Sequence, residues 1–212
     1  MLTLDHLAVV APSLPEGVAH VRDCLGIDMP EGGRHPQMGT RNHLLRLGEA
    51  VFLEVIAVDP EAAPPGRPRW FGLDDFGRVR ADWEAGRRLR SFVARTDDLD
   101  AVLARHGPLL GEAMRVTRGD LAWRFAVRPD GSMPEDGLAP CVMDWGSSGN
   151  PARGMPDLGA RLDALDLEHP DPDRAASLYA SIDLTDPPAI RPGDALRFTA
   201  RIRTPTGVRT LW

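Results

Sequence analysis

The chain has 212 residues, 42% of them hydrophobic, so it can bury a sizeable core as one domain or as two closely fused half-domains. Its 31 Asp and Glu against 25 Lys and Arg give a net charge of −6 with no long basic run, which argues against binding to a nucleic-acid backbone. No apolar run approaches the roughly 20 residues that span a bilayer, and Cys24 and Cys141 match no metal or redox spacing. We therefore expect a cytoplasmic protein that binds neither nucleic acids nor membranes.

The N-terminal segment is typical of a strand followed by a helix. Residues 2–10 (LTLDHLAVV) form a short apolar run with β-branched residues, which predicts a strand. Ser13 and Glu16 have the spacing of a capping box and predict a helix start. Gly26 predicts the helix end, because glycine readily takes the left-handed conformation at a C-cap.

Two strands joined by a tight hairpin follow, at residues 40–47 and 50–58. If one more strand lies in the Gly/Pro-rich residues 29–39, residues 1–58 form a β-α-β-β-β module. Residues 59–88 are rich in Pro, Gly and charge, and predict a long connection with one helical turn.

The same order of elements recurs in residues 89–146, which indicates an internal repeat. A strand is expected at 89–96 and an acid-started helix at 97–106, with Gly107 as its end. Three further strands complete this second module, at about 111–118, 121–128 and 138–145.

Residues 147–212 form a C-terminal partial module. A strand at 161–167 precedes a helix that opens at Asp171 and Pro172, and two more strands are expected at 195–203 and 207–211. Whether this part is an extra module or an addition to the second sheet stays open. The fold class is thus α+β, with tandem β-α-β-β-β modules and an extra C-terminal β-α-β unit.

Four segments carry a resemblance to a known family: LDHLAVV, GGRHPQMGTRNHLLRLG, VFLEVIAVDP and CVMDWG. Together they resemble the glyoxalase-like domain family of the vicinal-oxygen-chelate (glyoxalase/bleomycin resistance/dioxygenase) superfamily, over residues 2–150 with a weaker echo to about residue 185. The resemblance implies paired modules that curl into a mixed-sheet cup, and it allows a homodimer. It also implies a small oxygen-rich ligand, a divalent metal ion (Zn, Mn, Fe or another) and lyase, isomerase or dioxygenase chemistry.

Carried over residue by residue, the resemblance implies metal ligands at His6, Glu54 and Asp144, with Glu54 also catalytic. Ser91 stands at the remaining ligand position and is no usual ligand, which puts the metal in doubt. The strand pattern supports Glu54 independently, because a carboxylate within FLEVI costs several kcal/mol to bury without a partner. That partner is a metal ion, a set of hydrogen bonds, or a cation such as Arg41, Arg46 or Arg124, and pairing with an arginine would leave a metal-free cup.

The resemblance also implies a set of substrate-binding residues: His35, Arg41, Asn42, Trp123 and Arg124. Adjacent strand residues point to opposite faces, so only one of Trp123 and Arg124 faces the cup. We expect Trp123 in the core and Arg124 in the site, where it would clamp an anion. Trp70, Phe71 and Phe76 in the long connection either cover the pocket or pack in the core.

Two functions follow from these residues. One is a metal-dependent enzyme that holds a small oxygen-rich molecule in the cup. The other is a metal-free binding protein without turnover, like the drug-sequestering members of the same superfamily.

Overall fold

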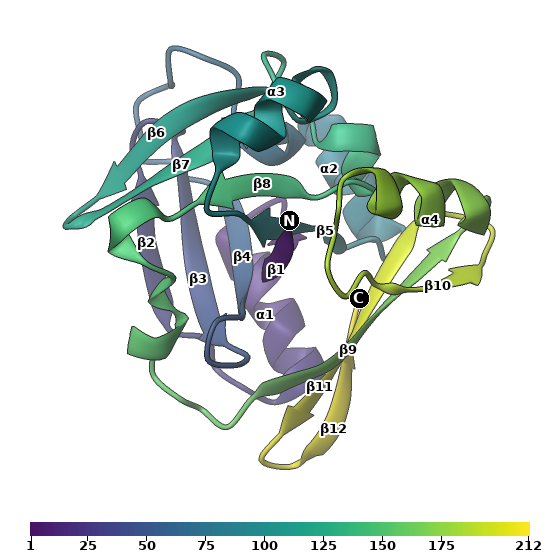
Figure 1. The fold of residues 1–212 in the computed structure, drawn as a ribbon. Coiled ribbons are helices and arrows are strands. Elements are labelled where there is room, and N and C mark those ends of the chain that lie inside the picture. Colours follow the sequence, from purple (N-terminus) through teal and green to yellow (C-terminus); the bar gives the residue numbers. More distant parts are fainter.

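The computed structural model describes all residues from Met1 to Trp212 and contains two sheets (Figure 1). The large sheet has eight strands in the order β2-β3-β4-β1-β5-β8-β7-β6. Its strands are β1 (Thr3–Val10), β2 (Glu31–His35), β3 (Thr40–Arg46), β4 (Phe52–Val58), β5 (Leu89–Arg95), β6 (Glu112–Arg118), β7 (Leu121–Val127) and β8 (Cys141–Asp144). The strands of the small sheet are β9 (Arg161–His169), β10 (Ala189–Pro192), β11 (Arg197–Thr204) and β12 (Gly207–Leu211).

Four α-helices and four short 3-10 helices connect the strands. The α-helices are α1 (Leu14–Leu25), α2 (Phe76–Glu84), α3 (Leu99–Leu110) and α4 (Pro172–Ser181). The 3-10 helices are η1 (Trp70–Gly72), η2 (Pro134–Gly137), η3 (Gly146–Ser148) and η4 (Pro151–Gly154). None of the helices combines the length and the apolar character that crossing a membrane requires.

The large sheet confirms the predicted pair of β-α-β-β-β modules. In each module the first strand runs parallel to the last, β1 with β4 and β5 with β8, and the modules join through the antiparallel pair β1 and β5. The predicted strand in the Gly/Pro-rich stretch is β2. The outermost strands, β2 and β6, contact each other, so the sheet curls into a nearly closed cup.

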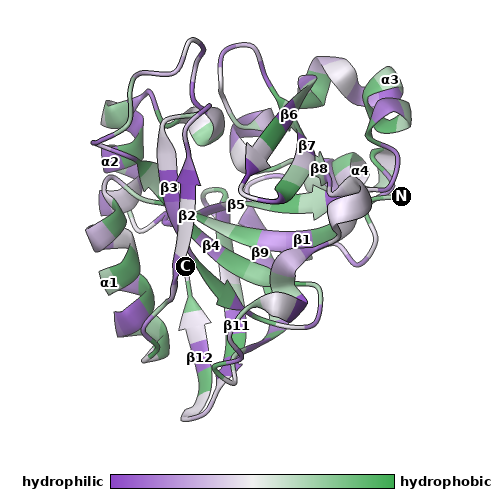
Figure 2. Ribbon diagram, turned by 90° about the vertical axis from the view of Figure 1, so that its left-hand side faces the viewer, coloured by the Kyte–Doolittle hydropathy of each residue, from purple (hydrophilic) through white to green (hydrophobic).

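The two faces of the large sheet bury separate cores. The outer core contains 33 buried residues and packs the sheet against α1, α3, α4 and the small sheet. The inner core contains 20 and lies between the two walls of the cup. The side chains of β4 alternate between the two cores: Leu53 and Val55 face the outer core, whereas Phe52 and Ile56 face the inner core. Figure 2 shows the middle of the sheet coloured mainly hydrophobic and α1 alternating along its length.

The predicted caps of the first helix are confirmed. Ser13 Oγ accepts a hydrogen bond from the Glu16 backbone N–H at 3.4 Å and donates one to the Glu16 carboxylate at 2.8 Å. Gly26 takes a left-handed conformation with φ of 68°, and its N–H donates to the Arg22 carbonyl. The helix accordingly spans Leu14–Leu25.

Two sequence-based boundaries were wrong. The helix expected to stop at Gly107 continues to Leu110, because Pro108 removes only one internal hydrogen bond and the Arg128 side chain donates to the exposed carbonyls of Pro108 and Leu109. The connection of residues 59–88 holds the nine-residue α2 in addition to a 3-10 turn, with Asp75 as its N-cap.

The C-terminal part is neither a third copy of the module nor a continuation of the second. Strands β9 and β10 flank α4 and pair in parallel, so a β-α-β unit is present as predicted. Its second strand, however, is β10 and not the strand expected at 195–203, which is β11 and pairs antiparallel with β9. In the small sheet β9 also pairs with β11, giving the order β10-β9-β11-β12, whereas a module would pair the first strand with the last. Its buried face packs on the outer core through Leu167, Phe198 and Ile202.

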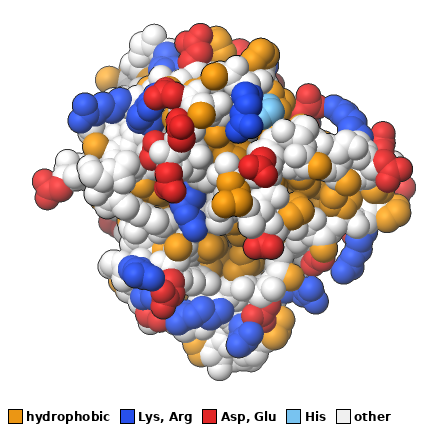
Figure 3. Space-filling model, in the orientation of Figure 1, with side chains coloured by type: hydrophobic (Ala, Val, Ile, Leu, Met, Phe, Trp, Pro, Cys, Tyr) orange, Lys and Arg blue, Asp and Glu red, His pale blue; other side chains and the backbone are white.

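Figure 3 shows acidic and basic side chains interspersed over the face in view, without a continuous patch of either sign. This distribution agrees with the moderate net charge of −6. On the face in view no basic stripe is present that would suit a phosphate backbone.

Candidate functional site

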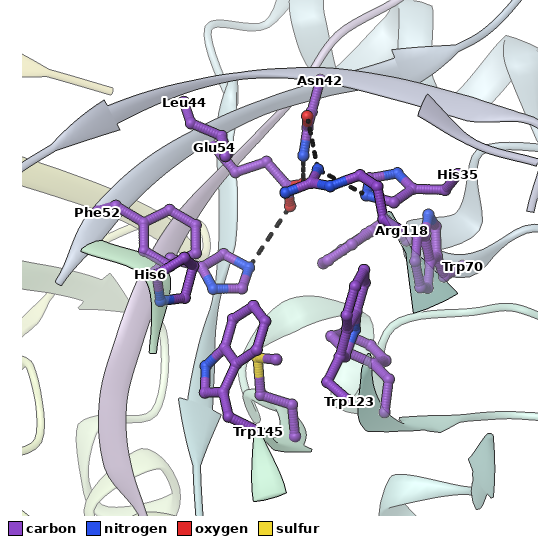
Figure 4. Close-up of a pocket in the computed structure, with 14 residues that line it drawn as sticks. His6, His35, Asn42, Leu44, Phe52, Glu54, Trp70, Arg118, Trp123 and Trp145 are labelled. Atoms are coloured by element: carbon purple, nitrogen blue, oxygen red, sulfur yellow. Dashed lines mark hydrogen bonds and ion pairs between the residues drawn. The ribbon is translucent and has the colours of Figure 1, made fainter. Parts of the chain in front are cut away.

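A pocket with a polar end and an aromatic end lies inside the cup (Figure 4). Its cavity volume is about 30 Å³, which holds about two water molecules. The lining residues are His6, His35, Asn42, Leu44, Phe52, Glu54, Trp70, Phe71, Arg118, Trp123, Phe125, Met143, Trp145 and Pro151. The polar members come mainly from β1 to β4, and most of the aromatic rings come from the second module and the connection.

A buried chain of charges forms the polar end. Asp5 Oδ1 accepts from His6 Nδ1 at 2.7 Å, and His6 Nε2 faces Glu54 Oε2 at 3.4 Å. Burial alone would lower the pKa of His6, but the hydrogen bonds and charges of the two carboxylates outweigh it and raise the pKa to about 9. Burial opposes ionisation of Glu54, but His6 and Asn42 keep its pKa below the ordinary value. His6 is thus an imidazolium and Glu54 a carboxylate at neutral pH.

Asn42 and Arg118 surround the far side of the Glu54 carboxylate. Asn42 Nδ2 donates to Glu54 Oε1 at 2.6 Å, and Asn42 Oδ1 accepts from the Gly33 N–H at 2.8 Å. Arg118 reaches over from the end of β6, with one nitrogen 3.5 Å from Asn42 Oδ1 and from His35 Nε2. Figure 4 shows these side chains gathered at one side of the pocket.

His35 takes the opposite protonation state to His6. Its Nδ1 lies 3.1 Å from Thr40 Oγ1, and that hydroxyl also accepts from Trp70 Nε1 at 3.2 Å. Burial lowers the pKa of His35 to about 4. The negative charge of Glu54 raises this pKa, whereas the positive charges of Arg118 and His6 lower it further. A neutral ring thus stands beside a charged one.

The opposite wall is aromatic. The Trp123 and Trp145 rings lie 5.4 Å apart, and Figure 4 shows both facing the polar group. Phe52 stacks on the His6 ring with 4.4 Å between centroids. Trp145 Nε1 donates to Asp5 Oδ2 at 2.9 Å, so the aromatic wall also holds the charge chain in place.

The pocket brings together five residues singled out from the sequence: His6, His35, Asn42, Glu54 and Trp123. Trp70 and Phe71 line it as well and belong to the buried inner core, whereas Phe76 is 62% exposed. Glu54 is paired with His6 and Asn42 and not with any of the three arginines considered as partners.

Three residues expected in the site lie outside it. Arg124 points out of the cup and pairs with Asp100 at 2.5 Å, because the register of β7 turns Trp123 inward. Asp144 faces outward between Met143 and Trp145, and its carboxylate accepts from the Gly146 N–H. Arg41 points to the other face of β3, between the inward-facing Thr40 and Asn42.

Sequence reasoning missed Asp5, Arg118 and Trp145 as contributors to the site. The RGD hairpin that carries Arg118 looks like an ordinary turn. Strand alternation assigns Asp5 to the face opposite His6, but the pairing of β1 with β5 shifts register between Leu4 and His6, which lets both side chains meet. Trp145 lies in the segment CVMDWG that carries the family resemblance, directly after Asp144, the residue that the sequence singled out instead.

The donor set of the pocket does not fit a divalent metal ion. No group of three His, Cys, Asp or Glu side chains is arranged to hold one. Both ring nitrogens of His6 already face carboxylates, Asp5 at 2.7 Å and Glu54 at 3.4 Å, and the Arg118 cation stands near Glu54. The second module, which would supply further ligands, presents Trp123, Met143 and Trp145.

Comparisons with known proteins agree with this fold. A family model described as a glyoxalase-like domain matches residues 4–182. A hypothetical protein from Staphylococcus aureus is similar with a TM-score of 0.61 at 14% identity, covering 93% of this chain and 88% of that chain. No curated protein sequence gives a significant match.

Two methylmalonyl-CoA epimerase structures are more distant. The one from Mycobacterium tuberculosis has a TM-score of 0.40 at 18% identity and covers 66% of this chain and 85% of that chain. A Streptomyces coelicolor variant in complex with 2-nitronate-propionyl-CoA has a TM-score of 0.42 at 18% identity, covering 70% and 100%. Similarity at this level carries no argument about the ligand of this chain.

Proposed function

This chain belongs to the glyoxalase-like domain family, and from that premise we propose that its pocket binds a small apolar molecule bearing an oxygen anion. The observation that carries the proposal is Arg118. It is a half-buried cation at the edge of an aromatic pocket, and it makes no ion pair with an acidic side chain. A ligand carboxylate or enolate would supply the missing partner.

The charges around Arg118 support an anion over a cation. His6 and Glu54 neutralise each other, while Asp5 has His6 at 2.7 Å and Arg95 at 3.7 Å. Arg118 is therefore the charge left over. Its partial removal from water is unfavourable and no acidic side chain offsets it, whereas an anion bound beside it would.

The rest of the lining supports an apolar, preferably aromatic, ligand body. Six aromatic rings of Trp and Phe surround the cavity. Such rings favour stacked or edge-on contacts with another ring. Because the present cavity holds only about 30 Å³, the ligand must displace Arg118 or a tryptophan ring as it enters.

Calorimetric titration with phenylacetate, and with neutral phenylacetamide as the uncharged control, tests the proposal. We expect phenylacetate to bind more tightly than the amide. Arg118→Met should weaken its binding at least tenfold, since a charge-assisted hydrogen bond contributes about 1.5–3 kcal/mol. Arg124→Met is the matched control, because that arginine lies on the neighbouring strand outside the pocket. Equal affinity in Arg118→Met and wild type would contradict the proposal.

Proton transfer is a second candidate function, supported by Glu54. An ionised carboxylate in an apolar pocket is placed like a general base, and the His6 cation beside it would stabilise a developing enolate. Exchange of the methylene protons of phenylpyruvate in D₂O, followed by NMR, tests this role. Exchange that is equally fast with Glu54→Gln excludes it, and binding without exchange leaves a metal-free sequestering protein of the bleomycin-resistance type.

A further inference from the structure

Two tryptophans of the aromatic pocket also line a second, larger hollow. This outer hollow has a volume of about 240 Å³, against about 30 Å³ for the pocket itself. Besides the shared Trp123 and Trp145, its lining includes Arg115, Arg124, Asp144, Ser147 and Ser148. The two indole rings lie 5.4 Å apart and therefore form the partition between the pocket and the outer hollow.

The large sheet has a gap behind this partition. Strand β8 pairs with β7 at only two positions and ends at Asp144, so residues 121–123 of β7 lack a strand neighbour on that side. The η3 turn covers the gap, and Ser148 Oγ accepts a hydrogen bond from the Ala122 N–H at 3.1 Å. Because the η3 turn is exposed, the outer hollow connects the back of the partition with solvent.

Trp123 is the pocket tryptophan that can move without breaking a hydrogen bond. Trp145 Nε1 donates to Asp5 at 2.9 Å, and Trp70 Nε1 donates to Thr40 at 3.2 Å. Trp123 Nε1 has no hydrogen-bond partner in the protein, and its ring is held by contacts with other rings. Turning Trp70 or Trp145 away would leave a buried acceptor without its donor, whereas turning Trp123 leaves none.

Arg118 links the position of the Trp123 ring to the ligand proposed above. Its guanidinium carbon lies 5.9 Å from the centroid of the Trp123 ring, which is a cation–π contact. The other ring neighbours of Trp123 are Trp145 at 5.4 Å and His35 at 6.1 Å. An anion bound to Arg118 competes with the ring face for the same cation, so it weakens one of the contacts that hold the partition closed.

We propose that Trp123 is the gate of the aromatic pocket and limits the length of its ligand, an inference that rests on the function proposed above. The pocket of about 30 Å³ is far smaller than the roughly 150 Å³ of a cavity that admits benzene, whereas the outer hollow of about 240 Å³ is larger. When the Trp123 ring turns into the outer hollow, the space that it leaves admits one aryl ring whose carboxylate reaches Arg118. The displaced indole then fills the outer hollow, so a ligand longer than one ring is excluded.

Calorimetric titration with phenylacetate and with the longer biphenyl-4-acetate tests this length limit. Wild type should bind phenylacetate about tenfold more tightly than biphenyl-4-acetate. Trp123→Ala joins the two hollows and should bind biphenyl-4-acetate more tightly than phenylacetate, and the milder Trp123→Leu should change the preference in the same direction. Trp212→Phe is the matched control, because this tryptophan is 38% exposed and lines neither hollow, and it should keep the wild-type preference.

Fluorine NMR of protein labelled with 5-fluorotryptophan tests the gate without a ligand. The Trp123, Trp70 and Trp145 resonances are assigned from the single Trp→Phe variants. In the free protein the Trp123 resonance should broaden on cooling while the other two stay sharp, and phenylacetate should shift the Trp123 resonance most.

A Trp123 resonance as sharp as those of Trp70 and Trp145, or Trp123→Ala and Trp123→Leu variants that keep the wild-type preference, would overturn the gate. A broadened Trp123 resonance in a protein that does not bind phenylacetate would support the gate and refute the proposed ligand.

Discussion

Raising the pH from 6.5 to 9 should destabilise this protein through one imidazole. Between two carboxylates, His6 has a pKa of about 9 in spite of its burial, against an ordinary value of 6.5. The folded state thus binds the proton more tightly than the unfolded chain does. Its contribution is fully present below pH 6.5 and is lost as the pH rises through 9. At about 1.4 kcal/mol per pH unit, the loss is about 3 kcal/mol.

The other groups with shifted pKa values affect stability mainly outside the range from pH 6.5 to 9. The sequence contains no lysine, and burial raises the pKa of Cys24 and Cys141 to about 11 and 12, so thiol effects begin near their ordinary value of 9. His35 and His20 act on the acid side, because burial lowers the pKa of both. The His35 pKa of about 4 means that its contribution is present above pH 6.5 and is lost as the pH falls through 4. We therefore expect maximal stability near pH 6.5.

Urea unfolding followed by tryptophan fluorescence, repeated across this pH range, measures the effect. Asp5→Asn removes a carboxylate that raises the pKa of His6, so its stability should fall less between pH 6.5 and 9. Asp144→Asn, outside the pocket, is the control and should fall like wild type. A wild-type stability that is flat over this range, or an unchanged slope in Asp5→Asn, would refute the reasoning.

Three further predictions concern the walls of the site and its metal content. Trp145→Phe keeps an aromatic side chain but removes a donor to buried Asp5, so the free energy of unfolding by urea should fall by about 1–3 kcal/mol. An unchanged value would mean that Asn150 alone satisfies this oxygen. Gly131→Ala should cost more than Gly119→Ala by calorimetric melting, since both have positive φ but only the first new Cβ collides with the Arg69 carbonyl oxygen. Adding Zn²⁺, Mn²⁺ or EDTA should leave the melting temperature unchanged, and a divalent ion retained at one per chain through purification would contradict the donor-set argument.

The first module's part of the site was predictable from the sequence because it depends on strand alternation alone. Glu54 is a polar residue within an apolar strand, and the period of two places it on the inner face with Phe52 and Ile56. Alternation also required Trp123 and Arg124 to face opposite ways, but which one faces inward depends on how β7 pairs with β8. That register is a non-local property, and the expectation chose the wrong residue.

Asp5 and Arg118 could not be predicted as site residues for a different reason. The position of Asp5 depends on a register shift between β1 and β5, which are some 85 residues apart in sequence and leave no local signal. Arg118 enters the pocket only because the curled sheet brings the end of β6 next to β2. Neither the β2–β3 hairpin nor the β6–β7 hairpin indicates by its own sequence that the sheet curls in this way.

The hydrogen bonds that hold the start of β1 affect the order in which the chain folds during synthesis. The N–H of Leu2 donates to the Asp183 carbonyl at 2.9 Å, and the Leu2 carbonyl accepts from the Thr185 N–H at 2.8 Å. A strand near the start of this sequence is therefore anchored by a segment that follows it by about 180 residues in the chain. Contacts of such long range slow folding, and until they form the nascent chain exposes the central strand of its large sheet. Chaperone dependence during expression should accordingly end only when the segment after α4 has emerged.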